Sequence, residues 1–175
     1  MDKELIKGLI AEYQQFVKSV AFVKRAVTLS DNFNYVFVGL RRVGKSYLMY
    51  QQIHHLIETG ISPEEILFFN FEDERIAGMD TEHLDMIKRC YEEMYSHRPI
   101  FFLDEIQIVP HWEQFVRRLA DQKYRVYVTG SNAKMLSKDI ATTLGGRFMI
   151  QYVYPFSFRE YLSSCLLYTS DAADE

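Results

Sequence analysis

Five short runs of apolar residues recur along the chain, separated by longer segments in which apolar and polar residues mix. Each run has the length of a strand and is apolar nearly throughout, whereas a strand with one face in water alternates between apolar and polar residues. Strands of this kind are covered on both faces, which is typical of a parallel sheet between layers of helices. The runs span residues 35–38, 66–71, 100–103, 126–128 and 148–153.

The intervening segments carry apolar residues three and four positions apart, which is the spacing of one face of a helix. This spacing predicts helices over residues 48–57, around residues 81–96, and over residues 110–119, the last of them starting at Pro110. A further amphipathic helix is predicted ahead of the first strand. Its apolar face comprises Leu5, Ile6, Leu9, Ile10, Tyr13, Phe16 and Val17.

The alternation of strands and helices predicts an α/β fold, a three-layer sandwich around a central parallel sheet of about five strands. A length of 175 residues with 48% hydrophobic content suits a globular domain with a substantial core. We divide the chain into an N-terminal helical segment (residues 1–34), a main domain (residues 35–162) and a C-terminal tail (residues 163–175).

The end of the tail, Cys165–Glu175, breaks with the helical pattern of the residues before it. It resembles the translation of a transposon-based sequencing adapter, so we expect the natural protein to depart from this sequence near Ser164 and to continue into a further part. A natural flexible terminus is the alternative. These eleven residues hold three of the 24 acidic residues, against 20 basic residues in the whole chain. The rest is therefore nearly neutral, and its mixed charges do not support nucleic acid as a partner.

Several other classes of protein are disfavoured. No segment offers eighteen uninterrupted apolar residues, and the N-terminus lacks the long apolar stretch of a secretory signal. We therefore expect no membrane partner and a cytoplasmic location. The two cysteines, Cys90 and Cys165, lack the spacing of metal ligands, which argues against a zinc site or a disulfide framework.

The strongest motif directly follows the first strand and reads Gly39-Leu-Arg-Arg-Val-Gly44-Lys45-Ser46, the G-x-x-x-x-G-K-S pattern of a Walker A loop. A glycine-rich turn points several backbone N–H groups at one place, and the following helix adds the positive end of its dipole, so a polyphosphate finds an anion site. Lys45 is expected to reach the β- and γ-phosphates, and Ser46 to ligate Mg²⁺. The expected nucleotide-binding residues are Gly39, Leu40, Arg41, Arg42, Val43, Gly44, Lys45, Ser46 and Tyr47, although the two arginines also suit exposed loop charges.

Two carboxylates, Asp104 and Glu105, close the third apolar run. Asp104 is expected to hold Mg²⁺ through its water shell, opposite Ser46, because a phosphate-bound Mg²⁺ keeps most of its waters and takes few protein ligands. Glu105 is expected to orient or deprotonate the attacking water. Such a pair can also lie in a surface turn, but after a Walker A loop it favours a Walker B element and Mg²⁺-assisted hydrolysis of ATP.

One strand and one helix separate the two motifs, and another strand follows Asp104. This arrangement resembles the branch of P-loop ATPases that has a catalytic glutamate. The resemblance implies that the strand after Asp104 lies between the other two and carries a polar sensor. The turn Thr129-Gly-Ser131-Asn132 occupies that position, and we favour Ser131 or Asn132 as the sensor. A turn that caps a helix is the alternative.

Six motifs follow one another along the chain: Gly39–Ser46, Phe69–Arg75, Leu103–Gln107, Val128–Asn132, Leu144–Arg147 and Tyr154–Tyr161. In this order they resemble those of a large bacterial and archaeal group of AAA+-like ATPases, from about residue 20 to residue 162. The resemblance implies that Arg147 acts as an arginine finger or γ-phosphate sensor, in the same subunit or a neighbour. Pairing of Arg147 with a local carboxylate is the alternative. Members of the group usually continue into a C-terminal domain.

We therefore expect an AAA+-like domain that binds ATP with Mg²⁺ and hydrolyses it slowly, with a second copy or another protein as partner. The expected catalytic residues are Lys45, Glu105, Ser131, Asn132 and Arg147, and the expected metal ligands are Ser46 and Asp104. One alternative is a nucleotide-dependent switch that controls the binding of DNA or a protein by a further domain. A small-molecule kinase is disfavoured, because that class needs a lid and an acceptor pocket and does not explain the Walker B pair with a sensor.

Overall fold

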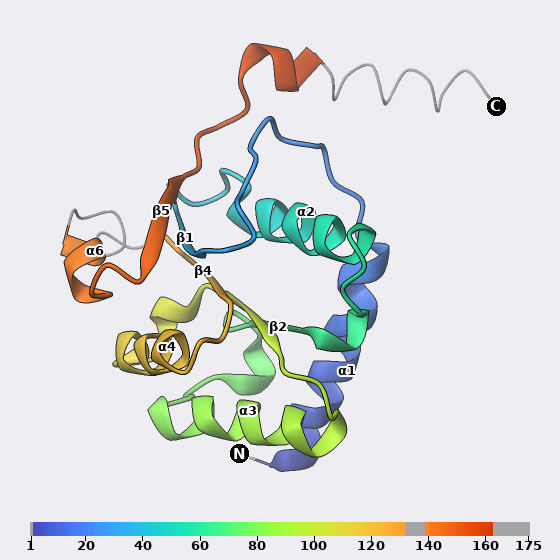
Figure 1. Cartoon of the computed structure of the whole chain (residues 1–175), viewed down its shortest axis with the longest axis vertical. Helices are drawn as coiled ribbons and strands as arrows, with labels where there is room; N and C mark the ends of the chain where they lie inside the picture. The colour runs from blue at the N-terminus through green and yellow to red at the C-terminus, as the bar shows by residue number, and fades with distance from the viewer. Residues whose placement is uncertain (1, 132–138, 163–175) are drawn as a thin grey trace.

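The computed structural model describes residues 2–131 and 139–162 of the chain (Figure 1). Five strands form one sheet in the order β2-β3-β4-β1-β5, and every neighbouring pair is parallel. The predicted parallel sheet is confirmed, and β4 lies between β1 and β3 as expected. The strands are β1 (Asn34–Val38), β2 (Ile66–Asn70), β3 (Ile100–Asp104), β4 (Val126–Gly130) and β5 (Phe148–Tyr152).

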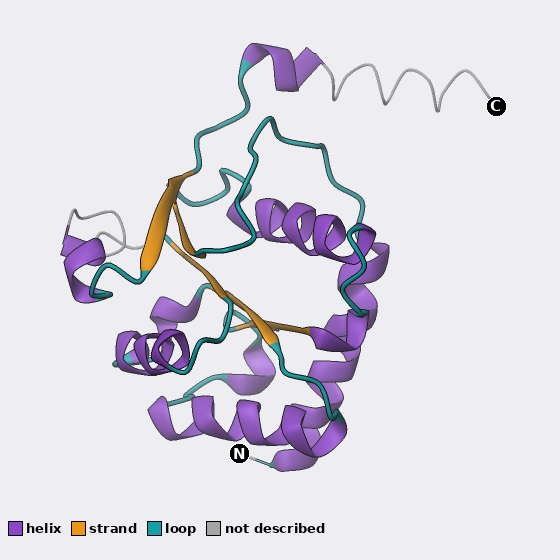
Figure 2. Cartoon of the chain, viewed as in Figure 1, coloured by secondary structure: helices purple, strands orange, loops and turns teal. Residues whose placement is uncertain are grey.

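Helices cover both faces of this sheet, with α2 on one face and α3 and α4 on the other (Figure 2). Tyr50 of α2 contacts Phe68 of β2, and Phe115 of α4 contacts Phe101 of β3. Because Phe68 is in register with Phe102, Phe68 and Phe101 point to opposite faces. The three-layer sandwich is therefore confirmed. Its helices are α1 (Lys3–Ser19), α2 (Lys45–Glu58), α3 (Thr81–Met94), α4 (Trp112–Asp121) and α6 (Asp139–Thr143).

The predicted N-terminal helix is present as α1. It begins after Asp2, whose side chain accepts a hydrogen bond from the N–H of Glu4 and caps the first turn. Tyr13 makes edge contacts with Phe68 and Phe69 of β2, so the apolar face of α1 joins the core of the sheet. None of the helices that the structure describes is long and apolar enough to cross a membrane.

The start of α4 differs from the prediction. Helix α4 begins at Trp112, not at Pro110, because His111 has a φ of 57° and is left-handed. A left-handed residue cannot continue a right-handed helix. The carbonyl of Pro110 instead accepts a hydrogen bond of 2.8 Å from the hydroxyl of Thr81. This bond links the segment before α4 to the first residue of α3.

Candidate active site

The loop between β1 and α2 lies at the carboxyl end of the sheet (Figure 1). Gly44 caps α2 with a φ of 92°, which residues with a Cβ rarely adopt. At Gly39, a Cβ would lie 2.4 Å from the carbonyl oxygen of Val153, so the chain leaving β5 passes directly against the loop. The first N–H groups of α2 have no partner within the helix, and they are the donors that a phosphate-binding loop presents.

The side chain of Lys45 joins this loop to the end of β3. Its Nζ donates a hydrogen bond of 3.0 Å to the carbonyl of Leu40 and lies 3.5 Å from Oε1 of Glu105. Both side chains are buried, with Lys45 4% exposed and Glu105 8% exposed. The structure therefore brings the expected phosphate-binding lysine and the expected catalytic glutamate together across the loop.

Asp104 is the last residue of β3 and is buried. Burial raises the pKa of its carboxyl to about 6, and hydrogen bonds from the hydroxyls of Thr129 and Ser46 partly oppose this shift. The hydroxyl of Ser46 therefore faces the carboxylate expected to share Mg²⁺ with it. Hydroxyl and carboxylate oxygens suit Mg²⁺, so these two residues fit the ion. Within residues 2–131 and 139–162 there is no group of three His, Cys, Asp or Glu residues suited to another metal.

Glu105 has a left-handed backbone, with a φ of 53°. Such a conformation is strained for a residue other than glycine and occurs often at functional sites. Its Oε2 accepts hydrogen bonds of 2.9 Å from the Ser131 hydroxyl and 2.6 Å from Nε2 of Gln107. Together with Lys45, these groups hold the carboxylate in place, and Ser131, one of the two candidates for the sensor, is among its hydrogen-bond donors.

The fully buried Thr129 of β4 is the residue that sequence analysis undervalued. Its Oγ1 donates a hydrogen bond of 2.5 Å to Oδ1 of Asp104 and accepts one of 2.8 Å from the N–H of Glu105. Its position as the first polar residue after the apolar run of β4 was the available signal. Gln107 was also missed, although it lies in the quoted motif Leu103–Gln107 and only two residues beyond Glu105.

Other expected nucleotide-binding residues line the outside of the loop. Leu40 and Tyr47 are 65% and 52% exposed. Arg41 forms an exposed ion pair of 2.9 Å with Glu72, which follows β2, and Arg42 has a left-handed φ of 63°. Asn132 and the tail Cys165–Glu175 lie outside the described residues.

Arg147 is not brought to the other site residues. It precedes β5 and therefore lies at the amino end of the sheet, about 16 Å of strand away from the carboxyl end. Its Nε donates a hydrogen bond of 2.5 Å to Oδ1 of Asp121, and its Nη1 donates to the carbonyl of Gly145. The local carboxylate pairing that the sequence left open is thus present, and the geometry offers Arg147 no contact with the site of its own subunit.

Comparisons with known proteins identify a family and relatives for this chain. A family model described as an AAA domain matches residues 31–162. An uncharacterized protein of Methanocaldococcus jannaschii is 33% identical over 162 residues, covering 91% of this chain and 35% of the relative. An uncharacterized protein of Haemophilus influenzae is 37% identical over 145 residues, covering 81% of this chain and 36% of the relative. The chain thus spans about a third of the length of these relatives.

The fold is also similar to solved structures. The S. cerevisiae Hsp104-ADP complex aligns with a TM-score of 0.53 at 15% identity, over 91% of this chain and 25% of that chain. At this level of identity the likeness concerns the arrangement of helices and strands.

Proposed function

The chain belongs to the AAA domain family, and we propose that it binds ATP with Mg²⁺ and hydrolyses the terminal phosphoanhydride bond. The observation that carries this proposal is the buried convergence of Lys45, Asp104 and Glu105 behind one glycine-rich loop. Burying three charged groups is costly unless they are paired. A site that handles a charged phosphate explains why they are kept there.

The loop residues would bind the triphosphate. Residues 39–47 would surround it. Backbone N–H groups of the loop and of the start of α2 would donate hydrogen bonds to the phosphate oxygens, and the ammonium of Lys45 would balance their negative charge. The Hsp104 structure of similar fold is a complex with ADP, a nucleotide of the class proposed here. The ammonium of Lys45 would exchange its bond to the Leu40 carbonyl for a phosphate oxygen.

Asp104 and Glu105 would have different roles in hydrolysis. Asp104 and Ser46 would hold Mg²⁺, which supplies charge neutralisation on the phosphate oxygens when bound. Glu105 would orient the attacking water and accept its proton. The bonds of Glu105 to Ser131 and Gln107 would keep its carboxylate aimed at the water, which supports the assignment of Ser131 as a sensor.

Two substitutions test this function in calorimetric titrations and phosphate-release assays. Lys45→Ala should lose MgATP binding, whereas Lys24→Ala, which removes an exposed lysine, should bind as the wild type does. Glu105→Gln should keep binding and lose turnover, because the amide cannot accept the proton. Full affinity in Lys45→Ala would refute the nucleotide site, and unchanged turnover in Glu105→Gln would refute the role of Glu105.

A nucleotide-dependent switch is the second candidate. The length of the relatives favours a switch. This chain covers 35% and 36% of the two relatives, so the rest of each relative has room for a domain that such a switch would control. Partners would then be a second copy, another protein or DNA, inside the cytoplasm where ATP is available. ATPase rates measured with and without DNA or candidate proteins separate the two functions, since stimulation by a partner indicates a switch.

A further inference from the structure

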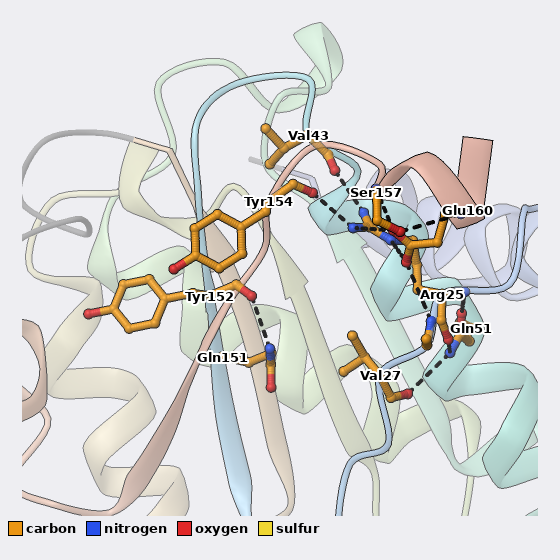
Figure 3. Close-up of polar contacts among 10 residues, drawn as sticks. Arg25, Val27, Val43, Gln51, Gln151, Tyr152, Tyr154, Ser157 and Glu160 are labelled. Carbon is orange, nitrogen blue, oxygen red and sulfur yellow. Dashed lines mark hydrogen bonds and ion pairs between the residues drawn. The ribbon is translucent and has the colours of Figure 1, made fainter. Parts of the chain in front are cut away.

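The guanidinium of Arg25 lies behind the phosphate-binding loop and joins it to the segment that follows β5 (Figure 3). Its Nη1 donates to the carbonyl of Val43 at 3.2 Å, its Nη2 to the carbonyl of Tyr154 at 2.9 Å, and its Nε to Oε1 of Glu160 at 2.8 Å. Arg25 is 8% exposed, and its Cζ lies 4.9 Å from the ring centroid of Phe156. A planar fork of donors suits several acceptors at once, which a lysine cannot reproduce.

Arg25 is itself held from both sides. Its backbone N–H donates to Oε1 of Gln51 at 2.6 Å, and Nε2 of Gln51 donates to the Arg25 carbonyl at 3.1 Å. On the other side, Glu160 accepts hydrogen bonds of 2.8 Å from both the N–H and the hydroxyl of Ser157, in the capping arrangement that starts the helical residues 158–162. The arginine is therefore fixed between α2, which begins at the loop, and the segment after β5.

The bond to Val43 sets the orientation of one peptide group in the loop. Because a trans peptide is planar, its C=O and N–H point in opposite directions. With the Val43 carbonyl bonded to Arg25, the N–H of Gly44 points away from Arg25. Glycine has wide conformational freedom, so without such a hold this peptide can rotate.

We propose that Arg25 is a positioning residue for the nucleotide phosphates. It holds the Val43–Gly44 peptide so that the Gly44 N–H is directed to the phosphate, and Glu160 and the Tyr154 carbonyl hold Arg25 in turn. Arg25 acts through the loop and does not contact the nucleotide. This inference rests on the proposed ATP-binding function.

The test separates positioning from simple stabilisation, using the full 175-residue chain. Arg25→Met should lower the melting temperature, because the partly buried Glu160 loses its positively charged partner. It should also weaken MgATP binding about tenfold or more, the effect of losing a charge-assisted hydrogen bond to the loop. In the double variant Arg25→Met with Glu160→Gln, the melting temperature should recover while the affinity stays low. Arg89→Met, which removes an exposed arginine of α3, is the matched control and should change neither.

Two results would overturn the inference: wild-type affinity in Arg25→Met, or an affinity that recovers together with the melting temperature in the double variant. Should Arg25→Met fail to fold, Arg25→Lys keeps the charge beside Glu160, and weaker MgATP binding is expected at a near-normal melting temperature. Wild-type affinity in Arg25→Lys would then refute the inference. Failure of the proposed function looks different, because the wild type would not bind MgATP or Lys45→Ala would bind it equally well.

Discussion

The hydroxyl of Thr129 donates a hydrogen bond of 2.5 Å to Oδ1 of Asp104, and neither residue is more than 4% exposed. Oγ1 of Thr129 also accepts a hydrogen bond from the N–H of Glu105. One side chain of β4 therefore positions both Asp104, the last residue of β3, and Glu105, which follows it. Thr129→Val keeps the shape and removes the hydroxyl. We expect it to lower the free energy of unfolding by about 1–3 kcal/mol, because a buried N–H loses its acceptor. Urea denaturation measures this loss.

The same substitution should reduce ATP turnover more than MgATP affinity, because the position of Glu105 matters most during hydrolysis. Thr129→Ser is the matched control: it restores the hydroxyl and should recover both stability and turnover. A Thr129→Val protein as stable and as active as the wild type would contradict this role for the hydroxyl.

The loop depends on a close approach at Gly39. A Cβ at this position would lie 2.4 Å from the carbonyl oxygen of Val153 and 2.9 Å from Cγ2 of Val43. Gly39→Ala should therefore displace the loop, lower the free energy of unfolding by about 1–3 kcal/mol and weaken MgATP binding. Thermal unfolding and calorimetric titration check both effects.

Gly8→Ala is the control for this substitution. Gly8 lies in α1, and a Cβ there would meet nothing within 4 Å. Alanine stabilises a helix interior relative to glycine by about 0.5–1 kcal/mol, so Gly8→Ala should raise stability and leave MgATP affinity unchanged. Normal affinity in Gly39→Ala would show that the loop tolerates the displacement.

The link between Arg25 and Glu160 should weaken in acid. Burial alone would raise the pKa of Glu160. Hydrogen bonds to its carboxylate outweigh this effect and lower the pKa to about 2; they come from the Ser157 N–H, from Arg25 and from the Ser157 hydroxyl. Glutamate in an unfolded chain has a pKa of about 4.3. Because the folded pKa is the lower one, the stabilisation is complete above about pH 5 and is lost as the pH falls toward 2.

Glu160→Gln cannot titrate and provides the reference. The difference in the free energy of unfolding between wild type and Glu160→Gln should shrink as the pH falls from about 6 to about 2.5. Urea denaturation at a series of pH values measures it. A difference that stays constant over this range would show that the carboxylate contributes no pH-dependent stability.

The strands were predictable because each one is apolar along its length and is bounded by segments of helical spacing. The observed Ile100–Asp104 and Ile66–Asn70 match the predicted runs to within one residue at each end. The start of α4 was not predictable, because the left-handed backbone of His111 leaves no periodic signal in the sequence.

The candidate site also has residues that the sequence could identify and residues that it could not. Lys45, Asp104 and Glu105 could be proposed as site residues from the sequence because the residues of each motif are consecutive, so local spacing alone singles them out. Thr129 acquires its role from strand order, which places β4 beside β3 and which was expected only from the resemblance to P-loop ATPases. Arg25 is separated from Glu160 by 135 positions, and the pair exists only through tertiary packing. Relationships of that kind leave no pattern that one sequence reveals.

Arg147 lies at the amino end of the sheet, away from the site of its own subunit, so a role in hydrolysis would require the site of a second copy. If it acts there as an arginine finger, Arg147→Ala and Glu105→Gln should each be inactive alone, and an equal mixture should regain activity. Random assembly pairs an intact Glu105 with a neighbour's intact Arg147 at about a quarter of head-to-tail interfaces. Phosphate release from the mixture measures the recovery.

The ion pair of Arg147 with Asp121 provides the control for this experiment. Asp121→Asn removes the charge of the local partner and leaves the arginine, so it should retain hydrolysis if Arg147 serves a neighbouring site. If Arg147 serves only to pair with Asp121, then Asp121→Asn and Arg147→Ala should behave alike and keep normal ATP turnover. Each should change the free energy of unfolding only slightly, since exposed ion pairs contribute about 0–1 kcal/mol. A mixture as inactive as its components would refute the shared site, because complementation requires that the two groups come from different copies.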